Sequence, residues 1–171
     1  MPLFRFCPRC GHELPHLPAD LRHIIRQDCP ACGEVHFQNA KPCAGALVIR
    51  EGKVLLGRRG IDPFKGWWDI PGGFLEPWEH PADGAMREVV EETGLVVRTG
   101  EILDIIVDTY GEGGDYTINI FFLAEVVSGE AKAGDDIVEL RWFGPDELPD
   151  EVAFTNGPMI LNVWRQRVAT H

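Results

Sequence analysis

The sequence predicts an α/β protein in which helices cover both faces of a mixed sheet, preceded by a small cysteine-bearing segment. β-rich runs and helical segments follow one another in the order strands, helix, strands, helix, which is typical of an α/β/α sandwich. Four of the five cysteines form two Cys-x-x-Cys pairs near the start of the chain. We therefore expect a four-cysteine module over residues 1–40 and an α/β domain over residues 41–171, because 171 residues allow one good core plus a small accessory module.

The first module is built on the pairs Cys7-Pro-Arg-Cys10 and Cys29-Pro-Ala-Cys32, which are separated by 18 residues. A glycine follows each pair and suits the tight turn that directs two thiolates at one ion. This spacing predicts a structural zinc ribbon with four thiolate ligands, Cys7, Cys10, Cys29 and Cys32. Two disulfides or a redox-active pair are the alternatives; the chain shows neither a secretory signal nor a βαβ context. Because about 40 residues cannot build their own core, Zn²⁺ would supply much of the folding free energy.

Two β-rich runs, residues 43–50 and 54–59, follow a predicted linker at residues 38–42 and indicate a hairpin or a pair of neighbouring strands. Arg58 and Arg59 end the second run. Because side chains alternate between the two faces of a strand, at most one of these arginines is expected to face a substrate phosphate. Cys43 starts the first run and is expected to be a buried thiol.

A loop rich in aromatic and turn-forming residues extends from residue 61 to residue 73. Phe64 and Trp67 either pack beneath the next helix or stack on a nucleotide base, and the sequence leaves both open. Tyr110 and Phe154, later in the chain, are stacking candidates of the same kind. The backbone carbonyls of Gly72 and Gly73 precede an acidic helix and are candidates to complete the oxygen shell of a metal ion.

That helix starts at residues 79–81, where Pro81 suits the first turn, and ends before Gly94, which suits a left-handed C-cap. Glu88, Glu91 and Glu92 share one face, and like charges at this spacing destabilise a helix. A solvated acidic face is the ordinary explanation, but the Pro-Gly-Gly loop just before it favours a bound divalent cation. The opposite face is an apolar stripe expected to dock on the sheet: Ala82, Ala85, Met86, Val89 and Val90.

The second half predicts strand material at residues 95–97 and 101–110, a strand at 115–127 that forms a hairpin with it, and a strand at 135–143. Alternation places Thr117 and Asn119 on one face of strand 115–127. It also places Asp136 and Glu139 on opposite faces of strand 135–143, so only one of these acids is expected to matter. Residues 144–149 indicate a short turn or helix, and residues 154–171 a final helix with Thr155 or Asn156 as N-cap.

The charge of the chain is unevenly distributed. Residues 1–42 hold five basic and four acidic residues, whereas the remainder holds 11 basic and 23 acidic ones. Such an acidic body would repel a nucleic-acid backbone, so nucleic acid is an unlikely partner. It would also repel a diphosphate unless cations neutralise the site. We see no membrane span and no signal peptide, and therefore expect a cytoplasmic protein.

The acidic helix and its loop carry a resemblance to a known family. The pattern Gly-x5-Glu-x7-Arg-Glu-hydrophobic-x-Glu-Glu-x-Gly-hydrophobic is filled at every specified position from Gly73 to Leu95. It resembles the Nudix box of hydrolases that act on a nucleoside diphosphate linked to another group. With the zinc ribbon, the Trp67-Trp68-x-Ile-Pro-Gly-Gly approach and the Arg141-Trp142-Phe143 tail, the resemblance spans nearly the whole chain. It implies the Nudix fold and favours a homodimer.

The charges and the resemblance together imply a mechanism. Mg²⁺ or Mn²⁺ would be held by Glu88 and Glu92, with Glu91 and the Gly73 carbonyl contributing, and would lower the pKa of a bound water. Attack of that water on a phosphorus would release a nucleoside monophosphate. Arg87 is expected to orient one of the carboxylates. The general base stays open among Glu88, Glu91, Asp136 and Glu139.

The substrate is less defined than the reaction. The chain is most similar to zinc-ribbon ADP-ribose and FAD pyrophosphatases, through Phe37-Gln38-Asn39-x-Lys41-Pro42 and Gly84-Ala85-Met86-Arg87-Glu88. It lacks the Ser-Gln-Pro-Trp-like segment of NADH pyrophosphatases, so NADH and dinucleoside polyphosphates are alternatives. A nucleotide sensor that does not cleave its ligand and an RNA-decapping enzyme are further rivals. The intact box disfavours the sensor, and the near-neutral ribbon disfavours the decapping enzyme.

Overall fold

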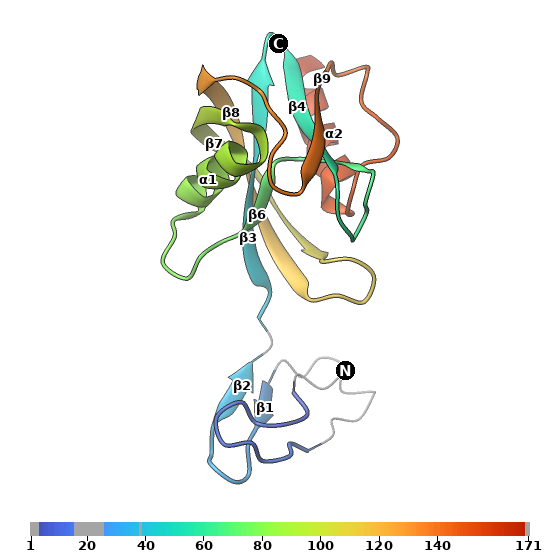
Figure 1. The fold of residues 1–171 in the computed structure, drawn as a ribbon. Coiled ribbons are helices and arrows are strands. Elements are labelled where there is room, and N and C mark those ends of the chain that lie inside the picture. Colours follow the sequence, from blue (N-terminus) through green and yellow to red (C-terminus); the bar gives the residue numbers. More distant parts are fainter. Residues whose placement is uncertain (1–3, 16–25, 38, 170–171) are drawn as a thin grey trace. The chain divides into compact units, whose positions relative to one another are not determined.

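The chain divides into two compact units, Met1–Asn39 and Ala40–His171, in a computed structural model that describes residues 4–15, 26–37 and 39–169 (Figure 1). No helix in these described ranges is long and apolar enough to cross a membrane. The first unit contains a two-stranded antiparallel sheet of β1 (Arg26–Asp28) and β2 (Val35–Phe37). Its buried apolar cluster in the described residues is small, Cys7, Leu14 and Cys29.

The second unit is built on one mixed sheet in the strand order β5-β4-β3-β8-β7, with β6 also paired to β3 and β9 to β4. β3 and β8 run parallel, and the other pairs are antiparallel. The strands are β3 (Lys41–Arg50), β4 (Lys53–Arg59), β5 (Trp68–Asp69), β6 (Gly72–Phe74), β7 (Leu95–Thr109), β8 (Tyr116–Gly129) and β9 (Ile137–Phe143).

Two helices cover the two faces of this sheet, α1 (Pro81–Thr93) and α2 (Asn156–Ala169) (Figure 1). The side chains of β3 alternate between two buried clusters because successive residues point to opposite faces. Ala46 and Val48 belong to the cluster of α1, whereas Leu47 packs in the cluster of α2. The predicted α/β/α sandwich around a mixed sheet is therefore confirmed.

β3 and β4 form the predicted antiparallel pair, but only over a short length. They pair only at Ile49–Val54 and Arg50–Lys53 and then separate. The other edge of β4 pairs with β9, and the other edge of β3 pairs with β8. The short strands β5 and β6 occupy the space that opens, with Asp69 opposite Gly57 of β4 and Gly72 opposite Gly45 of β3. This divergence of β3 and β4 brings the segment Pro71-Gly72-Gly73, called the glycine-rich loop below, into the middle of the sheet.

α1 follows the sequence prediction at both ends. The side chain of His80 accepts a hydrogen bond from the Ala82 backbone at 3.2 Å, and Gly94 adopts the left-handed conformation with φ 69°. Ala85 and Val89 are fully buried, as expected for the stripe that docks on the sheet. Val90 does not belong to that stripe: it is 44% exposed, because it lies one residue beyond the buried face.

Three further features differ from the sequence prediction. Lys41 and Pro42, assigned to a linker, begin β3. Residues 95–97 and 101–110 form one continuous strand, β7, whose register shifts absorb the interruption. At the start of α2 neither predicted N-cap side chain caps the helix: Asp108 of β7 accepts the backbone N–H bonds of Thr155 and Asn156 instead, at 2.9 and 2.8 Å.

Candidate active site

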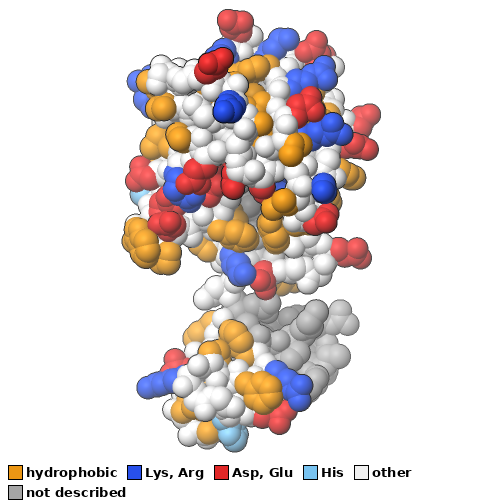
Figure 2. Space-filling model, viewed as in Figure 1, with side chains coloured by type: hydrophobic (Ala, Val, Ile, Leu, Met, Phe, Trp, Pro, Cys, Tyr) orange, Lys and Arg blue, Asp and Glu red, His pale blue; other side chains and the backbone are white. Residues whose placement is uncertain are grey.

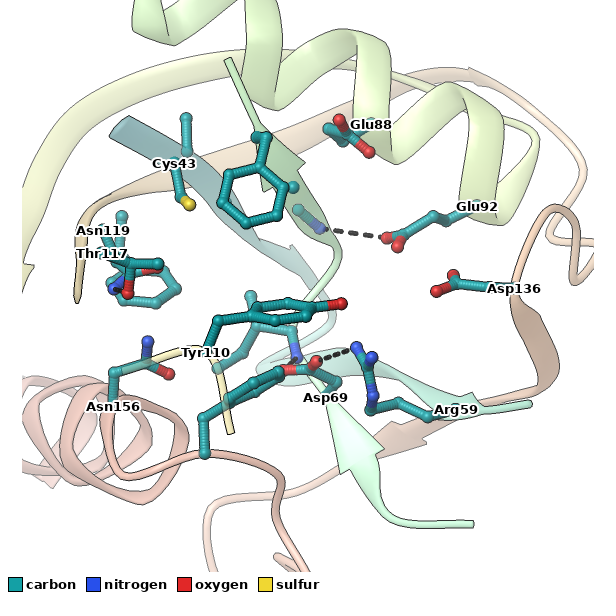
Figure 3. Close-up of a pocket in the computed structure, with 18 of the residues that line it drawn as sticks. Cys43, Arg59, Asp69, Glu88, Glu92, Tyr110, Thr117, Asn119, Asp136 and Asn156 are labelled. Atoms are coloured by element: carbon teal, nitrogen blue, oxygen red, sulfur yellow. Dashed lines mark hydrogen bonds and ion pairs between the residues drawn. The ribbon is translucent and has the colours of Figure 1, made fainter. Parts of the chain in front are cut away.

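A pocket with a volume of about 290 Å³ opens where the glycine-rich loop meets α1, the ends of β4 and β7, the face of β8 and the start of α2 (Figure 3). Acidic side chains gather on the surface of this unit in the space-filling view (Figure 2). Five carboxylates line the pocket, from Asp69, Glu88, Glu92, Asp135 and Asp136. Arg59 is the single Lys or Arg among the described lining residues, so acidic groups outnumber basic ones in the pocket.

Two glycines allow the loop to approach the acidic helix closely. The Gly72 N–H donates a hydrogen bond to Glu92 Oε2 at 3.0 Å. A Cβ atom on Gly73 would lie 2.6 Å from Glu88 Oε1, and one on Gly72 would lie 2.6 Å from the Ala44 carbonyl oxygen. Any side chain at these two positions would therefore displace either a carboxylate or the backbone of β3.

Arg87 organises the carboxylates around it. Its guanidinium donates to both oxygens of Glu79 at 2.8 and 2.9 Å, to Glu88 Oε1 at 2.7 Å and to Glu91 Oε2 at 3.0 Å. A fifth bond reaches the Phe74 carbonyl at 3.2 Å. The hydrogen bonds that Arg87 donates to Glu79 and then to Glu88 raise its pKa, so it stays charged. This geometry matches the orienting role predicted for Arg87, a role that itself stays a prediction.

Burial favours the neutral form of the acids deepest in the pocket. Glu92 is 6% exposed, and burial together with the charge of Asp69 raises its pKa to about 9. Burial also raises the pKa of Glu88, although Arg87 opposes the shift. Ionised carboxylates are costly in such a place unless a cation compensates them. A bound cation would therefore favour the ionised forms of Glu88 and Glu92.

Arg59 and Asp69 form a largely buried ion pair on the wall of the pocket. Arg59 Nη1 donates to Asp69 Oδ2 at 2.9 Å, and Arg59 Nε donates to the Pro63 carbonyl at 2.8 Å. The guanidinium also lies 5.1 Å from the ring centre of Phe154. Burial raises the pKa of Asp69 to about 6 even though Arg59 opposes the shift. The remaining Arg59 nitrogen, Nη2, is fully buried and has no hydrogen-bond partner among the described residues.

The donor set suits a hard divalent cation. Carboxylate oxygens of Glu88 and Glu92 lie beside the Gly72–Gly73 backbone, and such oxygens are the ligands that Mg²⁺ prefers. Glu91 is placed differently: it is exposed, does not line the pocket and is bonded by Arg87. In the described chain no three of the pocket acids have carboxylate oxygens all within 4.8 Å of one another, so water would complete the shell of a small cation.

The four predicted aromatic residues form a row in which two reach the pocket. Tyr110 and Phe154 line it, with ring centres 5.6 Å apart. Phe64 packs on Phe154 at 4.9 Å and Trp67 packs on Phe64 at 5.4 Å, and neither of these two lines the pocket. Trp67 is 38% exposed, as is Tyr110, so the row presents ring surface outside the cavity.

Strained backbone accumulates at this site. Positive φ angles occur at Phe64 (65°), Asp135 (49°) and Phe154 (59°), and two of these three residues line the pocket. Such conformations cost roughly 1–3 kcal/mol each in residues other than glycine and persist where the surroundings impose them. The packing of Phe64 on Phe154 is one such constraint.

The structure separates the two pairs of residues that the sequence left open. Arg59 and Asp136 line the pocket. Arg58 and Glu139 do not: they are exposed and form an ion pair with each other at 3.3 Å. Alternation along β4 accounts for the split between Arg58 and Arg59, whereas Asp136 lies in the turn before β9 and only Glu139 belongs to that strand.

Several pocket residues were missed from the sequence. Asp69 immediately precedes the glycine-rich loop, and an acid at that place was a signal that could have been used. Thr117 and Asn119 are polar side chains within an otherwise apolar strand, which was a second signal. Asn156 was considered only as a helix cap. Cys43 is buried as predicted and lines the pocket, where burial raises the pKa of its thiol to about 11.

The four cysteines of the first unit come together as one cluster. Among the described residues they are the one group of three or more His, Cys, Asp or Glu side chains with ligand atoms all within 4.8 Å of one another. The Sγ atoms of Cys7 and Cys32 are 3.7 Å apart and those of Cys10 and Cys29 are 3.6 Å apart. All four are free cysteines. The glycine after each pair has a positive φ, 74° at Gly11 and 72° at Gly33, as the predicted turns require.

Comparison with known proteins assigns the family. Residues 40–163 match the NUDIX domain family. The chain is 34% identical over 119 residues to an ADP-ribose pyrophosphatase of Methanocaldococcus jannaschii, covering 70% of each protein. It is also 31% identical over 147 residues to an NAD-capped RNA hydrolase, NudC, of Stutzerimonas stutzeri, covering 85% of this chain but only 50% of that protein.

A solved structure agrees in fold over almost the full length. A NUDIX hydrolase from Nitrosomonas europaea superimposes with a TM-score of 0.81 and 30% identity, covering 98% of this chain and 93% of that one. The chain belongs to the Nudix family of pyrophosphohydrolases, which typically depend on a divalent metal ion.

Proposed function

We propose that this enzyme hydrolyses the pyrophosphate bond of ADP-ribose or FAD in the presence of Mg²⁺ or Mn²⁺. The observation that carries the proposal is the Gly72–Gly73 loop held against Glu88 and Glu92, with Arg87 fixing Glu88 from behind. An ADP-ribose pyrophosphatase among the relatives, at 34% identity, supports the substrate class.

The cation would be held by Glu88, Glu92 and the Gly73 carbonyl, with Glu91 within reach of its hydration shell. When bound, it would neutralise phosphate oxygens and make the attacking water more acidic. The buried Glu92, whose pKa is about 9 in the absence of a cation, would release its proton as the cation binds.

The chain's own residues would do the rest. Arg59 would bind a phosphate oxygen through its unpartnered Nη2, while Asp69 holds its guanidinium in place. Asp136 faces the pocket and is our candidate for the general base, ahead of Glu139, which lies outside it. The water oxygen would bond to one phosphorus, its proton would pass to the base, and the bridging P–O bond would break. The products would be a nucleoside monophosphate and a second phosphate ester.

A second candidate function follows from the relatives that act on NAD-capped RNA, which match 85% of this chain. That reaction would use the same pocket on a pyrophosphate joined to an RNA end. The charge of the protein disfavours it, since residues 43–171 hold 23 acidic and 11 basic residues and would repel an RNA backbone.

A substrate screen tests both candidates. Purified full-length protein with Mg²⁺ would be given ADP-ribose, FAD, NADH, a dinucleoside polyphosphate and NAD-capped RNA, with release of nucleoside monophosphate measured by chromatography. We expect the highest kcat/KM for ADP-ribose or FAD. Preference for capped RNA would establish the second candidate, and tight nucleotide binding without turnover of any compound would identify a sensor instead.

We also propose that the four cysteines hold a structural Zn²⁺. Four sulfurs placed tetrahedrally about 2.3 Å from zinc would be separated by about 3.8 Å, which is close to the observed 3.6 and 3.7 Å. A disulfide would require about 2.05 Å. His36 Nε2 lies 3.3 Å from Cys7 Sγ and can donate a hydrogen bond to the thiolate. Zinc would hold together a unit whose described apolar cluster is very small.

A further inference from the structure

The pocket has two chemically different ends. Glu88, Glu92 and Asp136 lie at one end, and Thr117, Asn119 and Asn156 lie at the other, with Tyr110 between them (Figure 3). The second group carries no charge. Its members are 3%, 9% and 6% exposed, respectively, so these are buried polar side chains and not surface residues beside a cleft.

The fold fixes the orientation of Asn119. Its Nδ2 donates to the Ile106 carbonyl at 3.2 Å and to Thr117 Oγ1 at 2.9 Å. Because a backbone carbonyl can only accept a hydrogen bond, the amide nitrogen must face Ile106. The Asn119 Oδ1 atom is therefore turned away from β7, and within the described chain it accepts no hydrogen bond.

Asn156 is held just as firmly, but from its backbone. Its N–H donates to Asp108 Oδ2 at 2.8 Å, and the neighbouring Thr155 N–H donates to the same oxygen at 2.9 Å. Its side-chain amide lines the pocket and makes no hydrogen bond with another described residue. In the described chain Arg59 Nη2 is the single fully buried side-chain N or O atom without a hydrogen-bond partner, so the Asn156 amide is open to the cavity, where water or a ligand can satisfy it. Asn119 thus offers an unused acceptor, and Asn156 offers an unused donor and acceptor, to the same cavity.

This end of the pocket suits a compact, uncharged group with several hydroxyls. An anionic group would meet no cation there, and the carboxylates at the other end would repel it. Size adds a second limit: about 290 Å³ is at the lower end of the roughly 300–1,000 Å³ typical of small-molecule sites. A small polar group such as a pentose therefore suits this end of the pocket better than a large ring system such as a flavin.

We propose that Thr117, Asn119 and Asn156 form a subsite for an unsubstituted terminal pentose, so that the enzyme selects a nucleoside diphosphate sugar over dinucleotides. The base would then lie outside the cavity on the exposed rings of Tyr110 and Trp67. This inference rests on the proposed hydrolase function. It narrows the two substrates proposed above to ADP-ribose, with FAD and NADH as poor substrates.

The test compares two substrates that differ only at the terminal sugar, ADP-ribose and the methyl ester of ADP. Both contain the same base and the same pyrophosphate. We expect the wild-type enzyme to prefer ADP-ribose, and Asn119→Leu to lower kcat/KM for ADP-ribose roughly 10–100-fold, mainly through KM, because Asn119 Oδ1 no longer accepts a hydrogen bond from a sugar hydroxyl and a buried polar contact is lost. For the methyl ester of ADP, kcat/KM should change less than about twofold.

Asn162→Leu is the matched control, because it makes the same change at an exposed position of α2. It should leave kcat/KM unchanged for both substrates. Asn156→Ser, which keeps a residue suited to a helix start, repeats the test at a second position if Asn119→Leu fails to fold by circular dichroism. Equal losses on both substrates, or no loss on either, would overturn the sugar subsite while leaving hydrolysis intact. Absence of hydrolysis by the wild-type enzyme would overturn the proposed function, and the subsite with it.

Discussion

Replacing Glu92 by glutamine separates two effects that one buried carboxylate combines. Glutamine has nearly the same shape and its carbonyl oxygen can still accept the bond from the Gly72 N–H, observed at 3.0 Å. It cannot ionise and is a poor ligand for Mg²⁺. We therefore expect Glu92→Gln to lower kcat by orders of magnitude while the fold becomes more stable in the absence of metal.

The gain in stability follows from the pKa of Glu92. Burial, followed by the charge of Asp69, raises this pKa from the ordinary 4.5 to about 9. Because the folded state binds the proton more tightly than the unfolded state, the stabilisation is complete below pH 4.5 and is lost as the pH rises towards 9. At pH 7 the loss amounts to about 3 kcal/mol, and glutamine avoids it. For a chain of this size that corresponds to a Tm higher by roughly 6–12 °C.

The assay is thermal unfolding of both proteins in EDTA between pH 5 and pH 8, alongside turnover of ADP-ribose with Mg²⁺. The difference in Tm should be small at pH 5 and grow with pH, and Mg²⁺ should stabilise the wild type more than the variant. Glu112→Gln, at an exposed loop position, is the control and should change neither measurement. Near-full activity of Glu92→Gln would refute its role as a ligand, and a Tm difference independent of pH would refute the argument from burial.

Three other substitutions test separate parts of the site. Gly73→Ala should place its Cβ 2.6 Å from Glu88 Oε1 and push that flexible carboxylate aside, which lowers kcat about 100-fold but Tm by only a few degrees; unchanged kinetics would contradict this. Arg59→Lys cannot replace both the bond to Asp69 and the bond to Pro63, so it should cost about 2–4 kcal/mol in urea unfolding and raise KM. Unchanged urea unfolding and an unchanged KM would show that the buried Arg59–Asp69 ion pair contributes neither to stability nor to substrate binding. Cys10→Ser should reduce zinc content, measured by elemental analysis, and make the first unit sensitive to protease; retention of one zinc per chain would argue against the four-thiolate site.

Local sequence patterns predicted the parts of this protein that depend on local physics. The C-cap at Gly94, the turns at Gly11 and Gly33, and the buried stripe at Ala85 and Val89 each follow from neighbouring residues, and each is confirmed. Val90 was wrongly included because hydrophobic character alone does not show where a buried stripe ends. The start of α2 was predicted close to Asn156, but its capping group was not, since Asp108 comes from a strand 47 residues earlier than Thr155.

The composition of the pocket required the sheet topology. Arg59 and Asp69 meet only because β3 and β4 diverge and β5 pairs into the gap, and no spacing along the chain encodes that divergence. Asn119 and Asn156 meet because β8 lies between β3 and β7 and because Asp108 holds the start of α2. Sequence alone could offer Arg58 or Arg59, and Asp136 or Glu139, as equal members of two pairs. The structure places one member of each in the pocket.

Three features of this pocket reduce the stability of the fold, and together they indicate which ligand the site binds. Glu92 is buried as an acid, Arg59 keeps an unpartnered buried nitrogen, and Phe154 holds a positive φ angle. Each would lower stability if it occurred alone in a protein core. None of them is needed to form the sheet or to dock the helices, whose clusters are apolar. A cation, a phosphate and a stacked base would respectively relieve or use these features, which is why we assign all three to the binding of one nucleoside diphosphate.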